Sequence, residues 1–428
     1  MPLDKKKIII ISPHFPPSNL AAVHRTRLFA QHLPKFGWEP ILVTVHEKYY
    51  EEELDYNLVK LLPKDLRIIK TNAIPTKPLR LIGDIGIRAF YHIYKLVLNL
   101  IKTEKIDFLY IPIPSHFSAL LGRLIHAKTG VKYGIDYIDP WVHQWPGTEK
   151  KFSKHWWSMK LGEWLEPIAV KNASLITGVA EGYYKDVFER NPHLKNSCLR
   201  AAMPYGGEKE DVNTLKQLNL QSYLFEKKPG ILDFVYGGAM LPKAFEPLEM
   251  VMKCISENKS LFKNIKIHFI GSGKSPNDTN GYNIKYMAMK YGLWQSVFFE
   301  YPKRIPYLDV LTHLNAADGS FILGSTEPHY TPSKVYQAVL SEKPVFAILH
   351  QESSACEIIK KSRVGIVLEF NGRENLNVIA NNFVSEWETY IDFLSKYNIE
   401  NVDSAIFDQY SAVEVTKTLA TGLDKLNY

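Results

Sequence analysis

Two lysines in the second half of the chain follow short turns, in a setting that suits binding of a diphosphate. The segment YGGAMLPK places Gly238 in a turn directly after a predicted strand, and Lys243 five residues further on. Later, TPSK opens a predicted helix with Thr331 as a good N-cap, followed by Ser333 and Lys334. Free amides at a helix N-terminus attract anions, and ammonium groups neutralise them. These residues predict a phosphate seat; the alternatives are an ordinary Gly-Gly turn and a purely structural helix.

Neighbouring residues are candidates for contacts with the rest of a nucleotide ligand. Tyr336 and Gln337 lie one turn into the same predicted helix, within reach of a ribose. The segment GSGKS is not a P-loop, because the pattern GxxxxGK would need a glycine where the chain has His268. Gly271 and Gly273 are instead predicted to form a flexible turn near a ligand.

A carboxylate in the first half of the chain is suited to chemistry on a hydroxyl group. Asp139 lies in DYIDPW, just past a predicted buried strand and beside Trp141. A carboxylate in that position can act as a general base or orient the hydroxyl of a sugar. The alternative is that Asp139 caps the following turn.

The first loop, SPHFPPSNLAAVHRTR, supplies three polar candidates for an acceptor side, His14, Asn19 and Arg25. The loop contains no glycine, so the GxGxxG fingerprint is absent and binding of NAD or FAD is disfavoured. The alternative is that Asn19 is a helix N-cap and that Arg25 lies on a solvated face.

The elements that position these residues alternate between strand and helix. Apolar runs bounded by turn residues predict strands at residues 7–12, 41–45, 106–111, 131–137 and 175–179. Periodic segments predict helices at residues 20–36, 88–102, 118–128 and 181–190, the first of them ending at Gly37. Such alternation implies right-handed crossovers and a parallel sheet.

The alternation stops in a polar stretch and then begins again. Strands are predicted at residues 231–236, 265–270, 297–300, 320–323, 345–348 and 365–368, and helices at residues 333–340, 376–397 and 411–426. We therefore expect an α/β chain with two tandem Rossmann-like, doubly wound domains facing across a cleft. The predicted divisions are a first domain at 1–204, a linker at 205–229, a second domain at 230–405 and a C-terminal helix at 406–428 that crosses back to the first domain.

Composition narrows the possible partners. The 428 residues carry 52 Lys and Arg against 45 Asp and Glu, a net charge of +7 that favours anionic partners. The basic residues are dispersed, which disfavours nucleic acid. Three widely spaced cysteines make neither a zinc site nor a disulfide framework, and the short apolar N-terminus predicts no signal peptide, so we expect a cytoplasmic protein.

Two stretches mix aromatic and basic residues, as membrane-surface helices do. They are GIRAFYHIYKLVLNLIK, at residues 86–102, and HWWSMKLGEW, at residues 155–164. They predict peripheral contact with the inner face of a membrane. A helix packed on its own sheet explains the first stretch equally well.

The order of these motifs resembles that of family-4-type glycosyltransferases with the glycosyltransferase B (GT-B) fold. The motifs are a Pro-rich first loop, DPW after a middle strand, strand-GG-Lys, strand-GSG, and PSKVYQAVLSEKPVFA. The resemblance covers nearly the whole chain. It implies transfer of a sugar, with retention of configuration and without a metal or other cofactor, from a nucleotide-diphosphate donor to a glycan or a lipid-linked glycan. The absence of a DxD triplet agrees with the lack of a metal requirement.

The sequence departs from the family pattern at one pair of positions. The family has two glutamates eight residues apart, and the corresponding residues here are His329 and Gln337. Glu327 lies two residues before His329 and is a candidate to replace the missing carboxylate. This departure keeps open a binding or scaffold protein without turnover, and a nucleotide-sugar epimerase or a phosphorylase on the same fold remains a further alternative.

Overall fold

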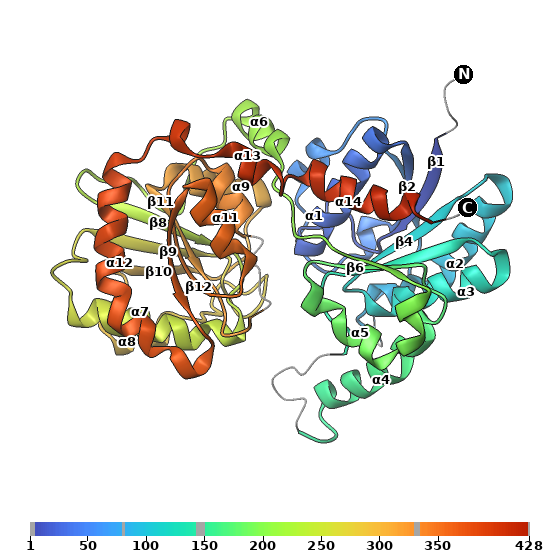
Figure 1. The fold of residues 1–428 in the computed structure, drawn as a ribbon, viewed down its shortest axis with the longest axis horizontal. Coiled ribbons are helices and arrows are strands. Elements are labelled where there is room, and N and C mark those ends of the chain that lie inside the picture. The colour runs from blue at the N-terminus through green and yellow to red at the C-terminus, as the bar shows by residue number, and fades with distance from the viewer. Residues whose placement is uncertain (1–4, 79–81, 143–149, 329–333, 427–428) are drawn as a thin grey trace. The chain divides into compact units, whose positions relative to one another are not determined.

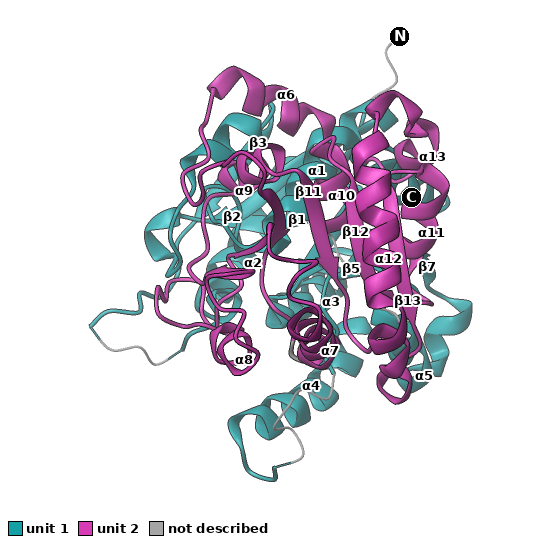
Figure 2. Cartoon of the chain, turned by 90° about the vertical axis from the view of Figure 1, so that its left-hand side faces the viewer, with its two compact units in different colours: residues 1–205, 412–428 teal, residues 206–411 magenta. Residues whose placement is uncertain are grey.

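The computed structural model describes residues 5–78, 82–142, 150–328 and 334–426, which divide into two compact units. Unit 1 comprises Met1–Tyr205 with Ala412–Tyr428, and unit 2 comprises Gly206–Ser411 (Figure 2). This division differs from the expected one in two places. First, residues 206–229 of the expected linker belong to unit 2 and contain a helix. Second, the segment that returns to unit 1 begins at Ala412 and not at residue 406, so it holds only the last helix of the chain.

Unit 1 is built on seven parallel strands in the order β3-β2-β1-β4-β5-β6-β7. The strands are β1 (Lys6–Ile11), β2 (Trp38–Val45), β3 (Arg67–Thr71), β4 (Phe108–Ile113), β5 (Lys132–Tyr137), β6 (Leu175–Gly178) and β7 (Leu199–Ala202). The helices are α1 (Ala21–His32), α2 (Ile85–Thr103), α3 (Ala119–Thr129), α4 (Lys154–Val170), α5 (Lys185–Arg190) and α14 (Ala412–Asp424). The two edge strands, β3 and β7, were not predicted, because they are short and only partly buried.

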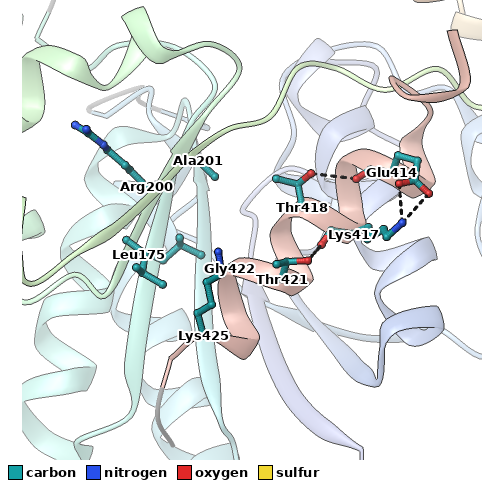
Figure 3. Close-up of a pocket in the computed structure, with 10 residues that line it drawn as sticks. Leu175, Arg200, Ala201, Glu414, Lys417, Thr418, Thr421, Gly422 and Lys425 are labelled. Atoms are coloured by element: carbon teal, nitrogen blue, oxygen red, sulfur yellow. Dashed lines mark hydrogen bonds and ion pairs between the residues drawn. The ribbon is translucent and has the colours of Figure 1, made fainter. Parts of the chain in front are cut away.

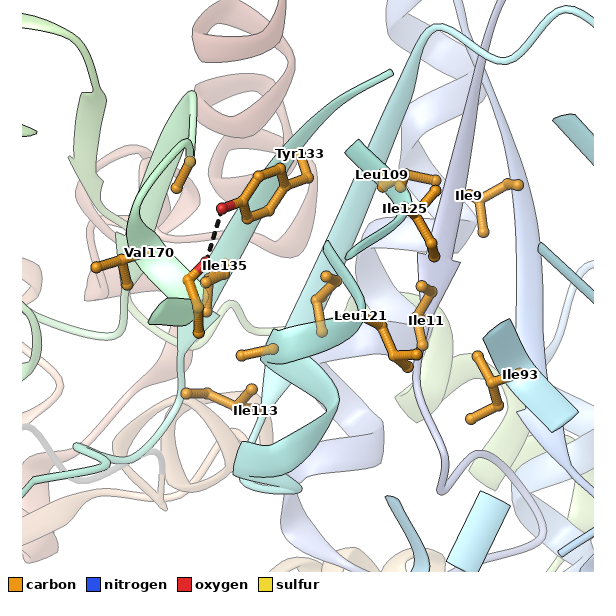
Figure 4. Close-up of a cluster of buried hydrophobic side chains, with 14 of the residues drawn as sticks. Ile9, Ile11, Ile93, Leu109, Ile113, Leu121, Ile125, Tyr133, Ile135 and Val170 are labelled. Atoms are coloured by element: carbon orange, nitrogen blue, oxygen red, sulfur yellow. Dashed lines mark hydrogen bonds between the residues drawn. The ribbon is translucent and has the colours of Figure 1, made fainter. Parts of the chain in front are cut away.

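The central strand β1 is buried on both faces, as its continuous apolar run predicts. Ile9 and Ile11 pack in one cluster, which Figure 4 shows with side chains from α2, α3, β4 and β5. Ile8 and Ile10 pack on the other face, in a cluster that includes Leu419 of α14. The last helix of the chain therefore belongs to unit 1 because it covers one face of this sheet.

Unit 2 is built on six parallel strands in the order β10-β9-β8-β11-β12-β13. The strands are β8 (Leu232–Gly237), β9 (Ile265–Ile270), β10 (Phe298–Tyr301), β11 (Gly319–Leu323), β12 (Val345–His350) and β13 (Gly365–Phe370). The helices are α6 (Lys209–Leu218), α7 (Phe245–Glu257), α8 (Lys285–Lys290), α9 (Tyr307–Ala316), α10 (Lys334–Leu340), α11 (Ser354–Ser362), α12 (Asn377–Lys396) and α13 (Ser404–Asp408).

Helices α7 and α12 lie side by side against this second sheet (Figure 1). Aromatic side chains fill the space between α12 and the strands: the ring of Phe346 lies 5.1 Å from those of Trp387 and Tyr390. The hydroxyl of Tyr390 donates to the carbonyl of Pro344 at 3.0 Å, which satisfies its buried polar group.

Each sheet has one point at which the strand order reverses, between β1 and β4 in unit 1 and between β8 and β11 in unit 2. Doubly wound proteins bind ligands at the carboxyl ends of strands at such points. The loops that follow these four strands are therefore the parts of each unit best placed to contact a ligand.

Candidate functional site

The Lys334 ammonium lies at the carboxyl end of β8, beside the reversal point of unit 2. Its Nζ donates to the hydroxyl of Tyr236 at 2.5 Å and to the carbonyl of Ala239 at 2.9 Å, and lies 4.1 Å from the centroid of the Tyr236 ring. Among the described residues, no carboxylate pairs with it. Within the part of the chain that the structure describes, neutral groups hold the Lys334 amine, a setting that suits an anionic ligand.

The Lys334 amine changes between its charged and neutral forms near neutral pH. Burial lowers the pKa of Lys334 to about 7, because its ammonium loses contact with water and gains no anion in return. A diphosphate placed against the amine would supply that anion and raise the pKa again.

The three predicted donor-side glycines shape the loops rather than offering amides to a phosphate. Gly238 has φ +111°, and a Cβ there would lie 2.8 Å from Cε of Lys334, so only glycine lets the lysine lie so close. Its N–H donates to the carbonyl of Ile270 at 2.8 Å. The amides of Gly271 and Gly273 likewise donate to backbone carbonyls, at 2.8 and 3.0 Å. These three amides are therefore bonded to backbone carbonyls, and the predicted position of the glycine turns near a ligand stays a prediction.

Lys243 and Glu327, predicted separately as donor-binding residues, form an ion pair with each other. Their Nζ and Oε1 atoms lie 2.7 Å apart, with the lysine side chain 50% and the glutamate side chain 24% exposed. The carbonyl of Lys243 also accepts a hydrogen bond from the amide of Thr326 at 3.1 Å. Unlike Lys334, Lys243 would have to exchange this carboxylate for a phosphate.

Helix α10 gives a mixed result for the predicted ribose contacts. Tyr336 is only 2% exposed and packs with Phe407 and Tyr410 at ring distances of 6.0 and 6.3 Å. Its assignment to the ribose is therefore corrected, since the side chain serves the packing of unit 2. Gln337 is half-buried, and its predicted contact with a ribose stays a prediction. Three predicted residues lie outside the described part of the chain: His329, Thr331 and Ser333.

A small cavity marks the reversal point of unit 1. Its volume is about 30 Å³, enough for a water molecule, and it lies at the carboxyl ends of β1, β4 and β5. The lining residues are Ser12, Pro13, His14, Leu20, Ala22, Thr26, Pro112, Pro114, Ser115 and Ile138. Of the predicted acceptor-side residues, His14 alone is among them.

A carboxylate that the sequence did not single out orients His14. The Nδ1 atom of His14 lies 2.9 Å from Oε1 of Glu52, which also accepts a hydrogen bond from the hydroxyl of Ser18. Burial would raise the pKa of Glu52, but the contacts with His14 and Ser18 outweigh it and lower the pKa to about 2. An ionised Glu52 makes Nδ1 the donor, which leaves Nε2 of a neutral His14 as a proton acceptor.

Asp139 lies just after β5, next to a second histidine that the sequence did not single out. The ring of His116 stacks on that of Trp141 at 5.7 Å and hydrogen-bonds to the main chain of Asp139. Burial lowers the pKa of His116 to about 4 and raises the pKa of Asp139. Within the described residues, the buried Nε2 of His116 has no hydrogen-bond partner. His116 therefore contacts the main chain of Asp139, while the Asp139 carboxyl has its proton affinity increased by burial.

Arg25 is a structural residue and does not face a ligand. Its side chain is 2% exposed and donates to both carboxylate oxygens of Asp136, at 2.6 and 3.0 Å. It also donates to the carbonyls of Met203 and Pro204, at 2.6 and 3.3 Å. Both the predicted acceptor role and the alternative of a solvated face are therefore corrected.

Asn19 is half-buried and does not cap the following helix. Helix α1 begins at Ala21, and its N-cap position is Leu20, one residue after the expected cap. The predicted acceptor-side role of Asn19 stays a prediction, while the N-cap alternative is corrected.

A larger groove, of about 350 Å³, lies between α14 and the amino ends of β6 and β7 (Figure 3). Leu175 and Leu199 begin these strands, and Lys417 pairs with Glu414 at 3.0 Å on the helix opposite. Ligand sites of doubly wound sheets lie at the other end of the strands. We therefore do not assign the groove to the site, in spite of its size.

The described residues contain no group of three or more His, Cys, Asp or Glu side chains arranged for a metal ion.

Solved structures resemble the whole chain. A glycosyltransferase from Rickettsia africae matches with a TM-score of 0.62 and 15% identity, over 99% of this chain and 100% of that chain. Anabaena HepE in complex with UDP and glucose matches with a TM-score of 0.61 and 14% identity, over 98% and 100%. A sucrose-phosphate synthase from Thermosynechococcus elongatus matches with a TM-score of 0.62 and 13% identity, over 97% and 98%.

These similarities show that the chain has the GT-B fold, as the motif order predicted. No family model matches the chain. The curated proteins contain no match either.

Proposed function

We propose that this protein is a glycosyltransferase that takes a sugar from a nucleotide-diphosphate donor bound by unit 2 and passes it to a hydroxyl acceptor bound by unit 1. The observation that carries the proposal is Lys334, a half-buried cation without an anionic partner among the described residues, at the reversal point of a GT-B unit. The similar Anabaena structure, solved with UDP and glucose, supports the nucleotide-sugar class.

The donor half of the reaction is the departure of the nucleotide diphosphate. As the bond from the anomeric carbon to the phosphate oxygen breaks, its electron pair stays on the diphosphate, where negative charge develops. Lys334 stabilises that charge, assisted by Lys243 once a phosphate replaces Glu327. The helix start at Thr331 and Ser333 is proposed to add amides. No metal ion and no further cofactor takes part in the proposed step.

The acceptor half is the attack of a hydroxyl oxygen of a glycan or lipid-linked glycan on the anomeric carbon. We propose retention of configuration, with the departing phosphate taking the hydroxyl proton. Asp139 and His14 then orient the hydroxyl, and Glu52 keeps Nε2 of His14 available as an acceptor. We propose that the reaction takes place in the cytoplasm, at the inner face of the membrane.

A thermal-shift screen tests the proposal most directly. A nucleotide sugar present at about 100 times its Kd should stabilise the folded protein by about 2.7 kcal/mol and raise its melting temperature. The screen compares UDP-, GDP-, dTDP- and ADP-sugars with the free sugars. A protein that is stabilised by none of them does not bind a nucleotide sugar, and the proposal fails.

Product analysis separates the remaining classes. A transferase needs both donor and acceptor, an epimerase releases an isomerised sugar without acceptor, and a phosphorylase depends on free phosphate. Donor binding without any turnover would identify a binding protein. That alternative is considered because both family glutamates are replaced in this sequence.

His14→Ala is expected to lower kcat by about 100-fold, because the variant lacks the ring nitrogen that orients the acceptor hydroxyl. Donor affinity should stay unchanged, because His14 belongs to unit 1 and Lys334 to unit 2. Glu52→Gln should lower kcat less and shift its pH profile, since Gln cannot hold the Nδ1 proton by charge. Measured kcat and KM for both variants, with Tyr286→Ser as an exposed control on unit 2, check this. A full kcat in His14→Ala would remove His14 from the acceptor side.

A further inference from the structure

The outward face of α4 exposes a stripe of large apolar side chains. Trp157, Leu161, Trp164 and Ile168 recur at spacings of four, three and four residues, so they share one face of the helix. They are 56%, 38%, 69% and 44% exposed. Phe152, just before the helix, is 73% exposed and lies 6.3 Å from the Trp157 ring. We call these five residues the α4 surface.

The opposite face of α4 is packed, so the helix is fixed in this orientation. Gly162 is buried, and a Cβ there would lie 3.1 Å from the Trp141 ring. The carboxylate of Glu166 is buried and accepts two hydrogen bonds from Arg190, at 2.9 and 2.7 Å. Because α4 is anchored on this side, the α4 surface has no place in the core of unit 1.

Lysines border the α4 surface. Residues 150–171 carry five lysines and two glutamates, and neither glutamate is free, since Glu166 bonds to Arg190 and Glu163 pairs with Lys160 at 2.6 Å. Helical spacing puts Lys154 on one side of the apolar stripe and Lys160 and Lys171 on the other. Apolar and aromatic side chains with lysines on both sides are the pattern of a helix that lies in the surface of an anionic bilayer.

The other stretch that was predicted to contact a membrane, residues 86–102, is packed against the sheet of unit 1. Helix α2 buries its apolar face in unit 1, where Ile93 and Val97 are fully covered. Tyr91, 60% exposed, is its one large apolar side chain of high exposure. In addition, none of the helices in the described part of the chain has the length and apolar character of a membrane span.

We infer that the α4 surface is a docking surface for a bilayer that contains anionic lipids. A protein partner fits these residues less well, because lysine is depleted at protein interfaces, whereas it is attracted to acidic headgroups. The two tryptophans of the stripe, Trp157 and Trp164, suit the boundary between headgroups and acyl chains. Docking would bring unit 1, the proposed acceptor side, to the membrane, but the inference does not rest on sugar transfer.

Vesicle sedimentation tests this inference without any nucleotide sugar. The full chain should bind vesicles of two parts phosphatidylcholine to one part phosphatidylglycerol more tightly than pure phosphatidylcholine. Added salt should weaken the difference, because the attraction of lysines to headgroups is screened. Trp157→Ser with Trp164→Ser should lower the partition coefficient by at least about tenfold, since two interfacial aromatic anchors are lost.

Matched controls keep the result interpretable. Tyr286→Ser removes an aromatic side chain of similar exposure, 72%, from unit 2 and should bind vesicles like the wild type. Both altered tryptophans are exposed, so the double variant should retain the wild-type melting temperature. Unchanged vesicle binding by the double variant overturns the inference. So does a wild-type dimer that the double variant converts to a monomer, because the surface would then be a protein interface.

Discussion

Arg25→Ala is expected to destabilise unit 1 by about 3–5 kcal/mol, the cost of removing one member of a buried ion pair. The change leaves Asp136, which is fully buried, without its cation, although the hydroxyl of Thr177 still donates to it at 2.8 Å. It also removes the donors for the carbonyls of Met203 and Pro204. Hydrogen exchange measured peptide by peptide should show amides of β5 and β6 exchanging at least about 100-fold faster.

Two variants control for this effect. Arg25→Met combined with Asp136→Leu replaces the pair by apolar groups and should recover most of the lost stability, because no uncompensated charge remains buried. Lys396→Ala breaks an exposed ion pair with Asp392 and should leave exchange unchanged. If Arg25→Ala exchanges like the wild type, the buried pair does not hold unit 1 together, and this prediction is wrong.

The regular parts of the fold could be predicted because their signals are local. The run of isoleucines in β1 predicts a strand covered on both sides, and clusters on each face cover it. Gly37, predicted to end the first helical segment, adopts φ +82° after a short 3-10 turn. Edge strands such as β3 carry weaker signals, because one side of their ladder and part of their side chains meet solvent. Their existence depends on the neighbouring strand more than on their own residues.

The site was harder to predict because its partners lie far apart in sequence. Glu52 belongs to a run of three glutamates that is typical of a solvated face, and only the fold brings it to His14. Arg25 and Asp136 are 111 residues apart, so nothing near Arg25 indicates that it is buried. The phosphate-binding role of Lys334 was predicted from the local pattern of a helix start. Its neutral surroundings could not be predicted in this way, because they depend on Tyr236, which lies in β8, 98 residues earlier.

Lys334→Ala is expected to weaken donor binding by about 10- to 100-fold, the loss of one hydrogen bond to a charged group at about 1.5–3 kcal/mol. Lys334→Met should have a similar effect while keeping the aliphatic stem against Gly238 and Tyr236. Lys243→Ala should cost less, since Lys243 is already neutralised by Glu327. Titration calorimetry with the donor found in the thermal-shift screen measures these differences. Asp139→Ala should slow transfer and leave donor affinity near that of the wild type.

The pH dependence of donor binding distinguishes a charged Lys334 from a side chain that only fills space. Burial lowers the pKa of Lys334 to about 7 in the free protein, and a bound diphosphate should raise it. Below that pKa the amine is charged in both states and affinity is highest. Above it, binding must take up a proton, so affinity should fall by up to about tenfold per pH unit. Calorimetry in two buffers of different ionisation enthalpy should detect proton uptake on donor binding in the wild type and not in Lys334→Met. Equal proton uptake in both proteins, or a donor affinity that Lys334→Ala leaves unchanged, would show that Lys334 does not contact the donor phosphates.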